Sequence, residues 1–162
     1  MVYNIMAQAL RHVMARFREY NKDPIDGFFC EPSEDVFKWK FTLLGPHNTP
    51  FEGEVLKGTI TFPPNFPNVP PVIQFTSQIY HPNIYTDGKV CMSILHDTRE
   101  ENFYDRPEEK WLPVHTIQSI VLSMLLIIQE PNLESPANLE AAKLMRDDKI
   151  QYYRKLRKMF KT

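Results

Sequence analysis

The segment YHPNIYTDGKVCMSIL, residues 80–95, holds side chains that can attack, donate a hydrogen bond and shape a loop. Cys91 is one of only two cysteines in the chain, and a cysteine thiolate is a strong nucleophile. Asn83 lies eight residues before it and carries an amide that can donate to an oxygen. Pro82 biases His81 toward extended geometry, so the imidazole can hold the bend by side-chain to backbone hydrogen bonds. The segment therefore offers a nucleophile, a neutral donor and a rigid frame.

The pair Asp87-Gly88 is expected at the centre of a tight chain reversal, because glycine adopts a positive φ without steric cost. A reversal centred there places Ile84 opposite Cys91 and makes Asn83 a diagonal neighbour of Cys91, roughly 5–8 Å away. An amide at that distance reaches an oxygen on a group attached to the sulfur. Catalysis by a thiol next to a hydrogen-bond donor is one interpretation of this spacing.

Residue types alone leave other interpretations of Cys91 open. A lone cysteine between Val90 and Met92 is more often a packing residue of a core than a nucleophile. A cysteine hydrolase needs a general base, for which His96 or His115 is available, but no protease nucleophile motif surrounds the cysteine. The histidines and cysteines show no short paired ligand spacing of the C-x-x-C kind, so no metal site is expected.

The chain has 162 residues, which suits a single domain spanning residues 1–162. Its net charge of −1 gives the whole molecule no electrostatic case for binding nucleic acid or a membrane surface. The longest mostly apolar run, residues 120–128, is too short to span a bilayer, and basic residues near the start argue against a secretory signal. Two cysteines provide no disulfide framework, so a reducing compartment, the cytosol or the nucleus, is expected.

Charge is distributed unevenly along the chain. Residues 96–110 include six acidic and three basic side chains, whereas residues 149–162 include six basic side chains and no acidic one. Residues 1–22 are also basic. Each patch alone is typical of a solvated surface, but the three together suggest charged partners that approach from different sides. The acidic segment also lacks hydrophobic periodicity, and loops of that length inside compact domains are usually functional or disordered.

Hydrophobic periodicity predicts a helix followed by antiparallel strands. Residues 4–20 carry one apolar stripe at helical spacing, formed by Met6, Leu10, Val13, Met14 and Phe17. Residues 36–44 and 54–62 alternate as strands, with Phe37, Trp39, Phe41 and Leu43 on one face of the first and Leu56, Ile60 and Phe62 on one face of the second. The five prolines of residues 62–71 exclude that stretch from a sheet, and residues 72–76 form a further short strand.

Helices follow the strands. Thr116 is a suitable cap for a helix over residues 117–129, which is apolar on almost every side and is therefore expected to be buried in the middle of the domain. Residues 139–160 provide one or two further helices. Because the helices gather after the strands instead of alternating with them, the fold class is α+β. Cys30 is interpreted as a structural residue.

Several motifs carry a family resemblance. The Trp39 region with the turn GPHNTPFEG, then FPPNFPNVPP, HPNIYTDGKVC, WLPVHTI and EPNLESPAN occur in the order found in ubiquitin-conjugating enzymes. The spacing of HPN and GKVC within residues 81–91 is highly specific to this family, and the resemblance extends from about residue 5 to residue 160. It implies an N-terminal helix, a four-stranded antiparallel meander sheet and C-terminal helices.

The resemblance also implies roles for the side chains around the thiol. Cys91 resembles the residue that carries ubiquitin as a thioester. Asn83 resembles the residue that stabilises the oxyanion when a lysine attacks, or braces the loop, and His81 resembles the residue that holds this loop. Asp87 and Gly88 belong to the periphery of that site. The implied partners are ubiquitin, its activating enzyme, a RING-type ubiquitin ligase and lysines of substrate proteins; the activating enzyme consumes the ATP, so no cofactor is expected.

The acidic segment resembles an insertion found in one branch of the family. This insertion, about residues 96–110, separates Cys91 from Trp111 by twenty positions and is similar to that of the G-type branch, whose members join ubiquitin to ubiquitin through lysine 48 for proteasomal degradation. Many family members have a carboxylate that orients the acceptor lysine at the position of Ser135, and serine cannot act as that base. The residues expected to attract and orient the acceptor instead are Asp97, Glu100 and Glu101 of the insertion, together with His96.

Partner surfaces are also implied by the resemblance. The basic helix that contains Arg11 would meet the activating enzyme and, together with the loops at 63–71 and 111–115, a ligase. The loop residues expected at these contacts are Phe66, Asn68, Trp111, Leu112 and Pro113. Asn68 occupies a position where the family usually has a large apolar anchor, and Leu112 is expected to supply apolar contact instead.

Overall fold

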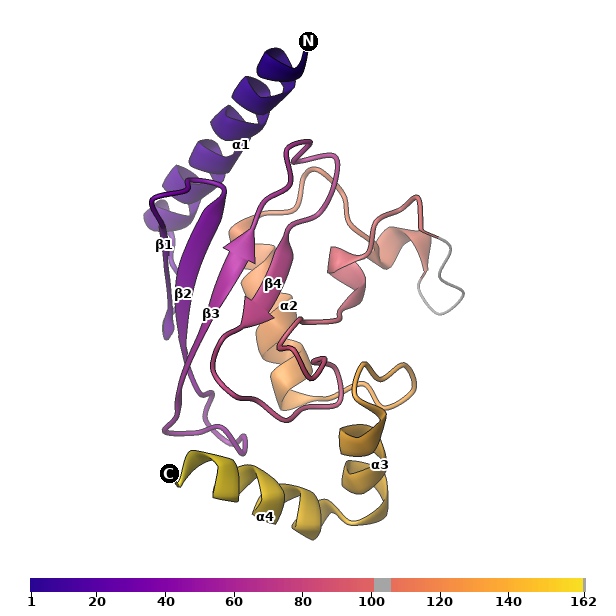
Figure 1. Ribbon diagram of the computed structural model, residues 1–162. Helices are drawn as coiled ribbons and strands as arrows, with labels where there is room; N and C mark the ends of the chain where they lie inside the picture. The colour runs from indigo at the N-terminus through magenta and orange to yellow at the C-terminus, as the bar shows by residue number, and fades with distance from the viewer. Residues whose placement is uncertain (101–105, 162) are drawn as a thin grey trace.

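The structure is a computed structural model that describes residues 1–100 and 106–161 (Figure 1). Its elements in chain order are α1 (Val2–Lys22), β1 (Phe28–Pro32), β2 (Lys38–Leu44), β3 (Val55–Thr61), β4 (Val72–Phe75), the short 3₁₀ helices η1 (Ser93–Leu95) and η2 (Pro107–Glu109), α2 (Ile117–Gln129), α3 (Leu139–Asp147) and α4 (Lys149–Phe160). The predicted α+β class is confirmed, and so are the N-terminal helix, the four-stranded sheet and the C-terminal helices that the resemblance implies.

The sheet is an antiparallel meander in the strand order β1-β2-β3-β4. Its register pairs Trp39 with Ile60 and Ile60 with Ile73, so alternate residues of each strand share the inner face. These three side chains are buried, whereas lysines and threonines occupy the outer face. Helix α2 packs behind the sheet (Figure 1), and residues of the sheet, of α2 and of the segment around Cys91 form one core cluster.

Strand β1 is the element that the hydrophobic pattern does not predict. It has five residues and forms one edge of the sheet, pairing with β2. Its Phe28 is buried whereas its Phe29 is exposed. Cys30 lies half-buried on the same strand, and burial raises the pKa of its thiol to about 12. A thiol of such high pKa is a poor nucleophile, which agrees with a structural role for Cys30.

Helix α1 extends away from the rest of the molecule in its N-terminal half (Figure 1). Val13 and Tyr20 are buried, but Met6 and Leu10 of the predicted stripe are exposed. The stripe prediction is therefore right only for the C-terminal half of the helix, where Phe17 packs edge-on against a tryptophan of β2 at 5.3 Å between ring centroids. The first turns of α1 project beyond the sheet and have no inner face to cover.

Helix α2 is not buried on almost every side, contrary to the prediction. One face packs into the core through Ile117, Ile120, Val121, Met124 and Ile128. On the opposite side Leu122 and Leu126 are 57% and 58% exposed, because the sheet covers only one side of the helix. The predicted cap is confirmed: the Thr116 hydroxyl accepts from the N–H of Ser119, and the Ser119 hydroxyl accepts from the N–H of Thr116.

The proline-rich stretch 62–71 lies outside the sheet, as predicted, and links β3 to β4. Phe62 and Phe66 are buried and pack together, and Phe66 also contacts Trp111 at 6.0 Å between ring centroids. The indole N–H of Trp111 donates to the carbonyl of Pro67 at 2.7 Å. The two loops that the resemblance assigns to a ligase contact therefore lie side by side.

The part of the chain that the structure describes contains neither a membrane-spanning helix nor a cluster of side chains suited to a metal ion. None of its helices is both long enough and apolar enough to cross a membrane. In residues 1–100 and 106–161, no three or more His, Cys, Asp or Glu side chains are placed to hold a metal ion.

Candidate active site

The chain reversal before Cys91 spans more residues than the predicted two-residue turn. The N–H of Gly88 donates to the carbonyl of Tyr85, and the N–H of Tyr85 donates to the carbonyl of Lys89, both at 2.9 Å. The turn between Tyr85 and Lys89 therefore contains three residues. Gly88 has a φ of 93°, and a Cβ added there would lie 2.1 Å from the carbonyl oxygen of Phe75, so only glycine fits.

The longer turn shifts the register of this segment by one residue. Ile84 pairs with Val90, and the N–H of Cys91 donates to the carbonyl of Asn83 at 2.9 Å. The prediction that Ile84 faces Cys91 is therefore wrong. Asn83 is the direct neighbour of Cys91 across the reversal, whereas the two-residue turn would have made it a diagonal one.

His81 is fully buried and binds two backbone groups. Its Nδ1 accepts from the N–H of Asn83 at 3.0 Å, and its Nε2 donates to the carbonyl of Ile127 at 3.1 Å. These partners require the neutral tautomer with the proton on Nε2. Burial lowers the pKa of His81 to about 4, so the ring stays neutral around pH 7 and holds the bend through both bonds.

The side chain of Asn83 is tied to the loop that follows α2. The residue is 1% exposed; its Nδ2 donates to the carbonyl of Asn132 at 2.8 Å, and its Oδ1 accepts from the N–H of Asn132 at 2.9 Å. This two-way exchange joins the HPN segment to residues 130–138. An amide nitrogen carries two hydrogens, and the bond to Asn132 uses one of them. Asn83 thus braces the loop and keeps one N–H for another acceptor.

The C-terminal helices and the loop after α2 hold the rest of the HPN segment. The hydroxyl of Tyr152, a buried residue of α4, donates to the carbonyl of Tyr80 at 2.7 Å. The carbonyl of Pro82 accepts from the N–H groups of Ala137 and Asn138 at 2.8 and 2.9 Å. Every residue from 80 to 83 is therefore anchored by a part of the chain that lies more than forty positions away.

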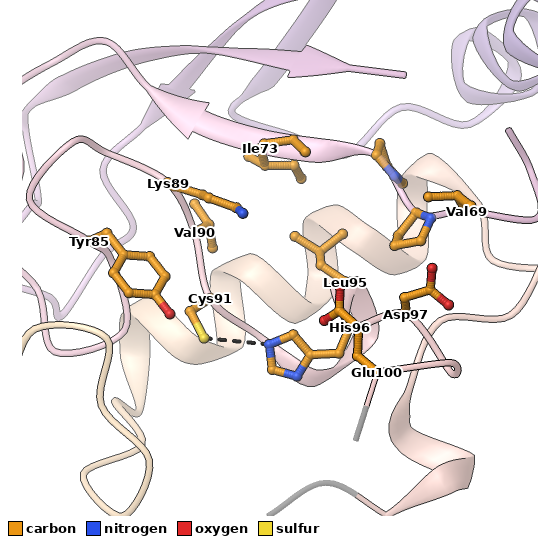
Figure 2. A pocket seen from close by; sticks show the side chains of 13 residues that line it. Val69, Ile73, Tyr85, Lys89, Val90, Cys91, Leu95, His96, Asp97 and Glu100 are labelled. Atoms are coloured by element: carbon orange, nitrogen blue, oxygen red, sulfur yellow. Dashed lines mark hydrogen bonds between the residues drawn. The ribbon is translucent and has the colours of Figure 1, made fainter. Parts of the chain in front are cut away.

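Cys91 is half-buried, whereas Val90 and Met92 on either side of it are buried. The alternation of an extended segment directs these two neighbours into the core and turns the thiol outward. The Sγ atom lies 3.5 Å from Nε2 of His96, at the start of the insertion. Repulsion from Cys91 raises the pKa of the Tyr85 phenol, whose ring points toward the sulfur (Figure 2). Cys91 is therefore a half-buried thiol next to His96 and Tyr85, and not a packing residue.

A cavity of about 270 Å³ opens beside the thiol (Figure 2). Its apolar walls come from the proline-rich stretch, β4 and the segment around the thiol, and include Val69, Pro70, Ile73, Val90 and Leu95. Tyr85 and Lys89 stand at one end of this cavity. His96, Asp97 and Glu100 stand at the other (Figure 2). The predicted His96, Asp97 and Glu100 are therefore brought together with Cys91.

The described ends of the insertion are bonded to each other. The N–H of Trp111 donates to the carbonyl of His96 at 2.9 Å. The buried Lys110 donates through Nζ to the carbonyl of Glu100 at 2.6 Å. These bonds close the neck of the insertion and fix the backbone of the two residues that flank the cavity.

The carboxylates predicted to orient an acceptor differ in their surroundings. Asp97 accepts from the backbone N–H of Arg99 at 3.0 Å and from its guanidinium at 2.5 Å, and these bonds lower the pKa of Asp97 to about 2. Asp97 is thus occupied by Arg99, whereas Glu100 is exposed at the cavity. Glu101 lies outside the described residues. Ser135 is half-buried in the loop after α2 and is absent from the described lining of the cavity.

The residues expected at partner contacts divide into two groups. Four of them are exposed: Arg11, Asn68, Leu112 and Pro113. Phe66 and Trp111 are 3% and 2% exposed, so their rings are covered by the chain itself, and their place at a partner contact stays a prediction. Both aromatic rings belong to the core and shape the two loops that present the exposed residues.

Comparison with known proteins places this thiol site in a family. Residues 12–160 match the family described as "Ubiquitin-conjugating enzyme". That match covers the HPN segment, Cys91 and the insertion, together with the sheet and helices that hold them. The chain belongs to the ubiquitin-conjugating enzyme family, and its activity is that of a ubiquitin-conjugating transferase.

Individual relatives resemble the chain over nearly its whole length. It is 41% identical over 153 residues to "Ubiquitin-conjugating enzyme E2 7" of Arabidopsis thaliana, covering 93% of this chain and 92% of the relative. It is 40% identical over 154 residues to "Probable ubiquitin-conjugating enzyme E2 7" of Caenorhabditis elegans, covering 93% and 94%. It is 39% identical over 149 residues to "Ubiquitin-conjugating enzyme E2 G2" of Homo sapiens, covering 90% of each, which agrees with the G-type branch.

Sequence reasoning missed three residues of the site. Tyr85 and Lys89 line the cavity. The position of Lys89 could have been predicted from the reversal, because residues two positions apart in an extended segment, such as Lys89 and Cys91, share one face. Tyr152 reaches Tyr80 from a distant helix, and no local pattern indicates that contact.

Proposed function

We propose that Cys91 receives ubiquitin from the activating enzyme as a thioester and passes it to a lysine of an acceptor protein. The observation that carries this proposal is the position of the thiol on a cavity wall, 3.5 Å from Nε2 of His96. His81 is assigned the task of holding the loop, and Asp87 and Gly88 that of shaping the reversal. ATP is consumed upstream by the activating enzyme, so this chain needs no cofactor of its own.

In the charging step, the thiolate of Cys91 attacks the thioester carbonyl carbon on the activating enzyme. A new carbon–sulfur bond forms, the old one breaks, and the sulfur of the activating enzyme leaves as a thiolate. An ordinary thiol has a pKa of about 8.5 and is ionised to a small extent at pH 7, so a nearby base increases the reactive fraction. In the tautomer that leaves Nε2 unprotonated, His96 accepts the thiol proton.

In the transfer step, the acceptor amine attacks the thioester carbonyl, an oxyanion forms, and Cys91 leaves as a thiolate. The free N–H on Nδ2 of Asn83 is assigned to the oxyanion, while the rest of that amide holds Asn132. Asn83 then combines the two roles that the resemblance left open. The geometry around it supports bracing directly, and the hydrogen that bracing leaves over is the donor proposed for the oxyanion.

The acceptor lysine must approach the thioester and lose a proton, since a free lysine has a pKa of about 10.4. Glu100 and His96 are assigned this work because both line the cavity beside the thiol. Asp97 instead keeps Arg99 in place. Glu101 keeps its assignment on sequence grounds alone. The hydroxyl of Ser135 does not serve as a base near neutral pH.

The thioester assignment is tested by mixing the protein with activating enzyme, ATP and ubiquitin and separating the products without reductant. We expect a band heavier by one ubiquitin that disappears on addition of thiol. Cys91→Ala should give no band, and Cys91→Ser should give one that resists thiol, because an oxyester replaces the thioester. Cys30→Ala is the matched control and should charge normally. Absence of a band for the unmodified protein would reject the assignment.

Replacing Glu100 with glutamine should slow ubiquitin chain formation while leaving charging of Cys91 intact, because it removes the carboxylate and keeps the shape of the side chain. A double replacement of Glu100 and Glu101 should slow it further. Single-turnover transfer from the charged enzyme to ubiquitin measures the effect, and Glu54→Gln, an exchange before β3, serves as the control. Unchanged chain formation in the double variant would remove the insertion carboxylates from the mechanism.

The chain linkage and the ligase type are proposed from the similarity to the G-type branch of the family. The acidic insertion and the similarity to a relative named E2 G2 support assembly of chains through lysine 48 of ubiquitin, with a RING-type ligase, for proteasomal degradation. Arg11, Asn68, Leu112 and Pro113 are assigned to the surface for the activating enzyme and the ligase. The cytosol or the nucleus is the expected location. Ubiquitin with arginine in place of lysine 48 should then stop chain growth after the first transfer.

A further inference from the structure

The cavity beside Cys91 carries side chains of opposite charge at its two ends (Figure 2). Lys89 stands at one end with Tyr85, and Glu100 stands at the other with His96. The walls between these ends are largely apolar. A ligand that lies across the thiol therefore meets a cation on one side and an anion on the other.

Lys89 is positioned next to the reacting atom by the backbone. It lies two residues before Cys91 in an extended segment, so both side chains leave the same face and their Cα atoms are about 7 Å apart. Its N–H donates to the carboxylate of Asp87 at 2.9 Å, and its carbonyl accepts from the N–H of Tyr85 at 2.9 Å. The buried Val90 fixes the same stretch from the core side.

The ammonium group of Lys89 is available to a ligand. It is exposed, and no carboxylate of residues 1–100 or 106–161 forms an ion pair with it. The nearest acidic neighbour in sequence, Asp87, uses its carboxylate on the backbone of Lys89. A lysine ammonium on a flexible stem can follow a partner over several ångströms, which suits recognition of a carboxylate whose position varies.

The opposite end of the cavity determines how an acceptor would lie. Asp97 is occupied by Arg99, so Glu100 is the described carboxylate that remains for an incoming ammonium. An acceptor lysine that enters on the Glu100 side directs its amine toward Cys91. The residues beside it in the acceptor chain then extend toward Lys89, where a positive charge would repel them and a negative charge would bind.

We propose that the enzyme prefers acceptor lysines that have a carboxylate side chain nearby, and that Lys89 binds this carboxylate. The inference rests on the proposed function, since it requires that Cys91 carry the thioester. Lys89 takes no part in bond making or breaking and acts only on how the acceptor binds. Exposed ion pairs are weak, so we expect a preference of roughly two- to five-fold in transfer rate, which decreases as salt is added.

The test uses full-length enzyme charged with ubiquitin and then freed of activating enzyme and ATP. Capped peptides with one lysine are offered as acceptors; they differ in a single flanking residue, which is glutamate, alanine or lysine at each position within three residues of the acceptor. N-acetyl-lysine amide, which has no flanking charge, is the reference acceptor. Lys89→Glu is compared with Lys57→Glu, the same charge change on the outer face of β3, away from the cavity.

The unmodified enzyme and Lys57→Glu should prefer the glutamate peptide at one or more flanking positions, and Lys89→Glu should prefer the lysine peptide at the same positions. All three should charge with ubiquitin, and for each enzyme the peptide rates are expressed relative to its own rate of discharge to N-acetyl-lysine amide. Equal discharge of the unmodified enzyme to all peptides would overturn the inference and leave the thioester mechanism untouched. A glutamate preference that persists in Lys89→Glu would overturn the assignment to Lys89. Failure to charge at all would instead reject the proposed function.

Discussion

Two histidines near the thiol differ in role because their surroundings differ. His81 is buried, both of its ring nitrogens bind backbone groups, and burial lowers its pKa to about 4. His96 lies at the cavity with Nε2 facing the sulfur of Cys91. A ring with both nitrogens bound to the backbone cannot exchange protons with substrate, which agrees with loop support by His81 and leaves the proton transfer proposed above to His96.

We expect the free energy of unfolding to decrease as the pH is lowered from about 6.5 to about 4. Across this range the unfolded His81, with its ordinary pKa of 6.5, binds a proton, while the folded form, with a pKa of about 4, does not. The stability that comes from keeping the ring neutral is therefore complete above pH 6.5 and is lost on acidification. The difference corresponds to about 3 kcal/mol.

Denaturant titrations of the unmodified protein and of His81→Gln at several pH values measure this contribution. The glutamine variant should be less stable at pH 7 and should lack this part of the pH dependence, because its side chain does not titrate. Carboxylates titrate in both proteins and cancel in the difference. Parallel pH profiles for the two proteins would show that His81 is not the group responsible.

The residue types of the HPN segment predicted the site better than its spacing did. Asp87-Gly88 marked a turn correctly, but glycine with a positive φ suits both a two-residue turn and a three-residue turn followed by a bulge. The choice is made by bonds to β4: the N–H of Phe75 donates to the carbonyl of Gly88 at 2.8 Å, and the N–H of Val90 donates to a carbonyl of β4 at 2.9 Å. Such contacts between distant segments cannot be read from a local pattern.

At the scale of elements, the catalytic segment has little regular structure and depends on the helices around it. Three groups each bind one part of residues 80–83: the carbonyl of Ile127 in α2, Asn132 in the loop after α2, and the hydroxyl of Tyr152 on α4. Tyr152 is buried, and its ring stacks on that of Tyr80 at 5.5 Å between centroids. The last helix is therefore connected directly to the residue before the HPN motif.

Tyr152→Phe should reduce stability and slow transfer to lysine. It removes the hydroxyl donor and leaves the Tyr80 carbonyl without that partner, at a cost of roughly 1–2 kcal/mol in unfolding free energy. The looser HPN segment should lower the maximal rate of thioester discharge several-fold, with little change in the acceptor concentration required for half that rate. Thermal unfolding and single-turnover discharge measure the two effects.

The control for this variant is Tyr153→Phe on the same helix. The hydroxyl of Tyr153 makes no hydrogen bond to another described residue, so its loss should leave stability and discharge near those of the unmodified protein. Equal behaviour of the two variants would argue against a connection from α4 to the active site.

The sequence-based predictions fail for two elements that lie at the edge of the sheet or of the core, β1 and α2. β1 consists of FFCEP, and only its pairing with β2 reveals it as an edge strand. The composition of α2 predicted burial all round, yet Leu126 and Ile127 line a second hollow of about 430 Å³ together with Met92 and Ile94. Apolar content indicates that a side chain avoids water but not whether a core or a partner supplies the cover.

For the whole molecule, three separate segments form the proposed partner surface. Arg16 of α1 donates to the carbonyl of Pro113 at 2.9 Å, and Trp111 donates to the carbonyl of Pro67 at 2.7 Å. These bonds hold α1, the proline-rich stretch and residues 111–115 in one arrangement. The motifs predicted a partner contact for each segment. Only the folded chain shows that Leu112 is exposed whereas its neighbour Trp111 is buried.

Asn68→Phe should strengthen binding of a RING-type ligase. Asn68 is exposed beside the loop at 111–115, and an aromatic ring there offers an apolar anchor of the kind that dominates such interfaces. We expect the dissociation constant to decrease about five-fold or more, which corresponds to roughly 1 kcal/mol. Leu112→Ala should weaken binding through the same surface, and charging of Cys91 serves as the folding control. Unchanged affinity in both variants would locate the ligase elsewhere.

The groups of the C-terminal part that bind the HPN turn are mostly main-chain groups. They are the carbonyl of Ile127, the N–H and the carbonyl of Asn132, and the N–H groups of Ala137 and Asn138. A peptide group persists through almost any exchange of the side chain it carries, and proline alone deletes its N–H. The bonds to residues 81–83 therefore come from the main chain of residues 132 and 137 and not from the side chains that these residues carry. The position of the thiol is in this way tied to the path of the main chain after α2.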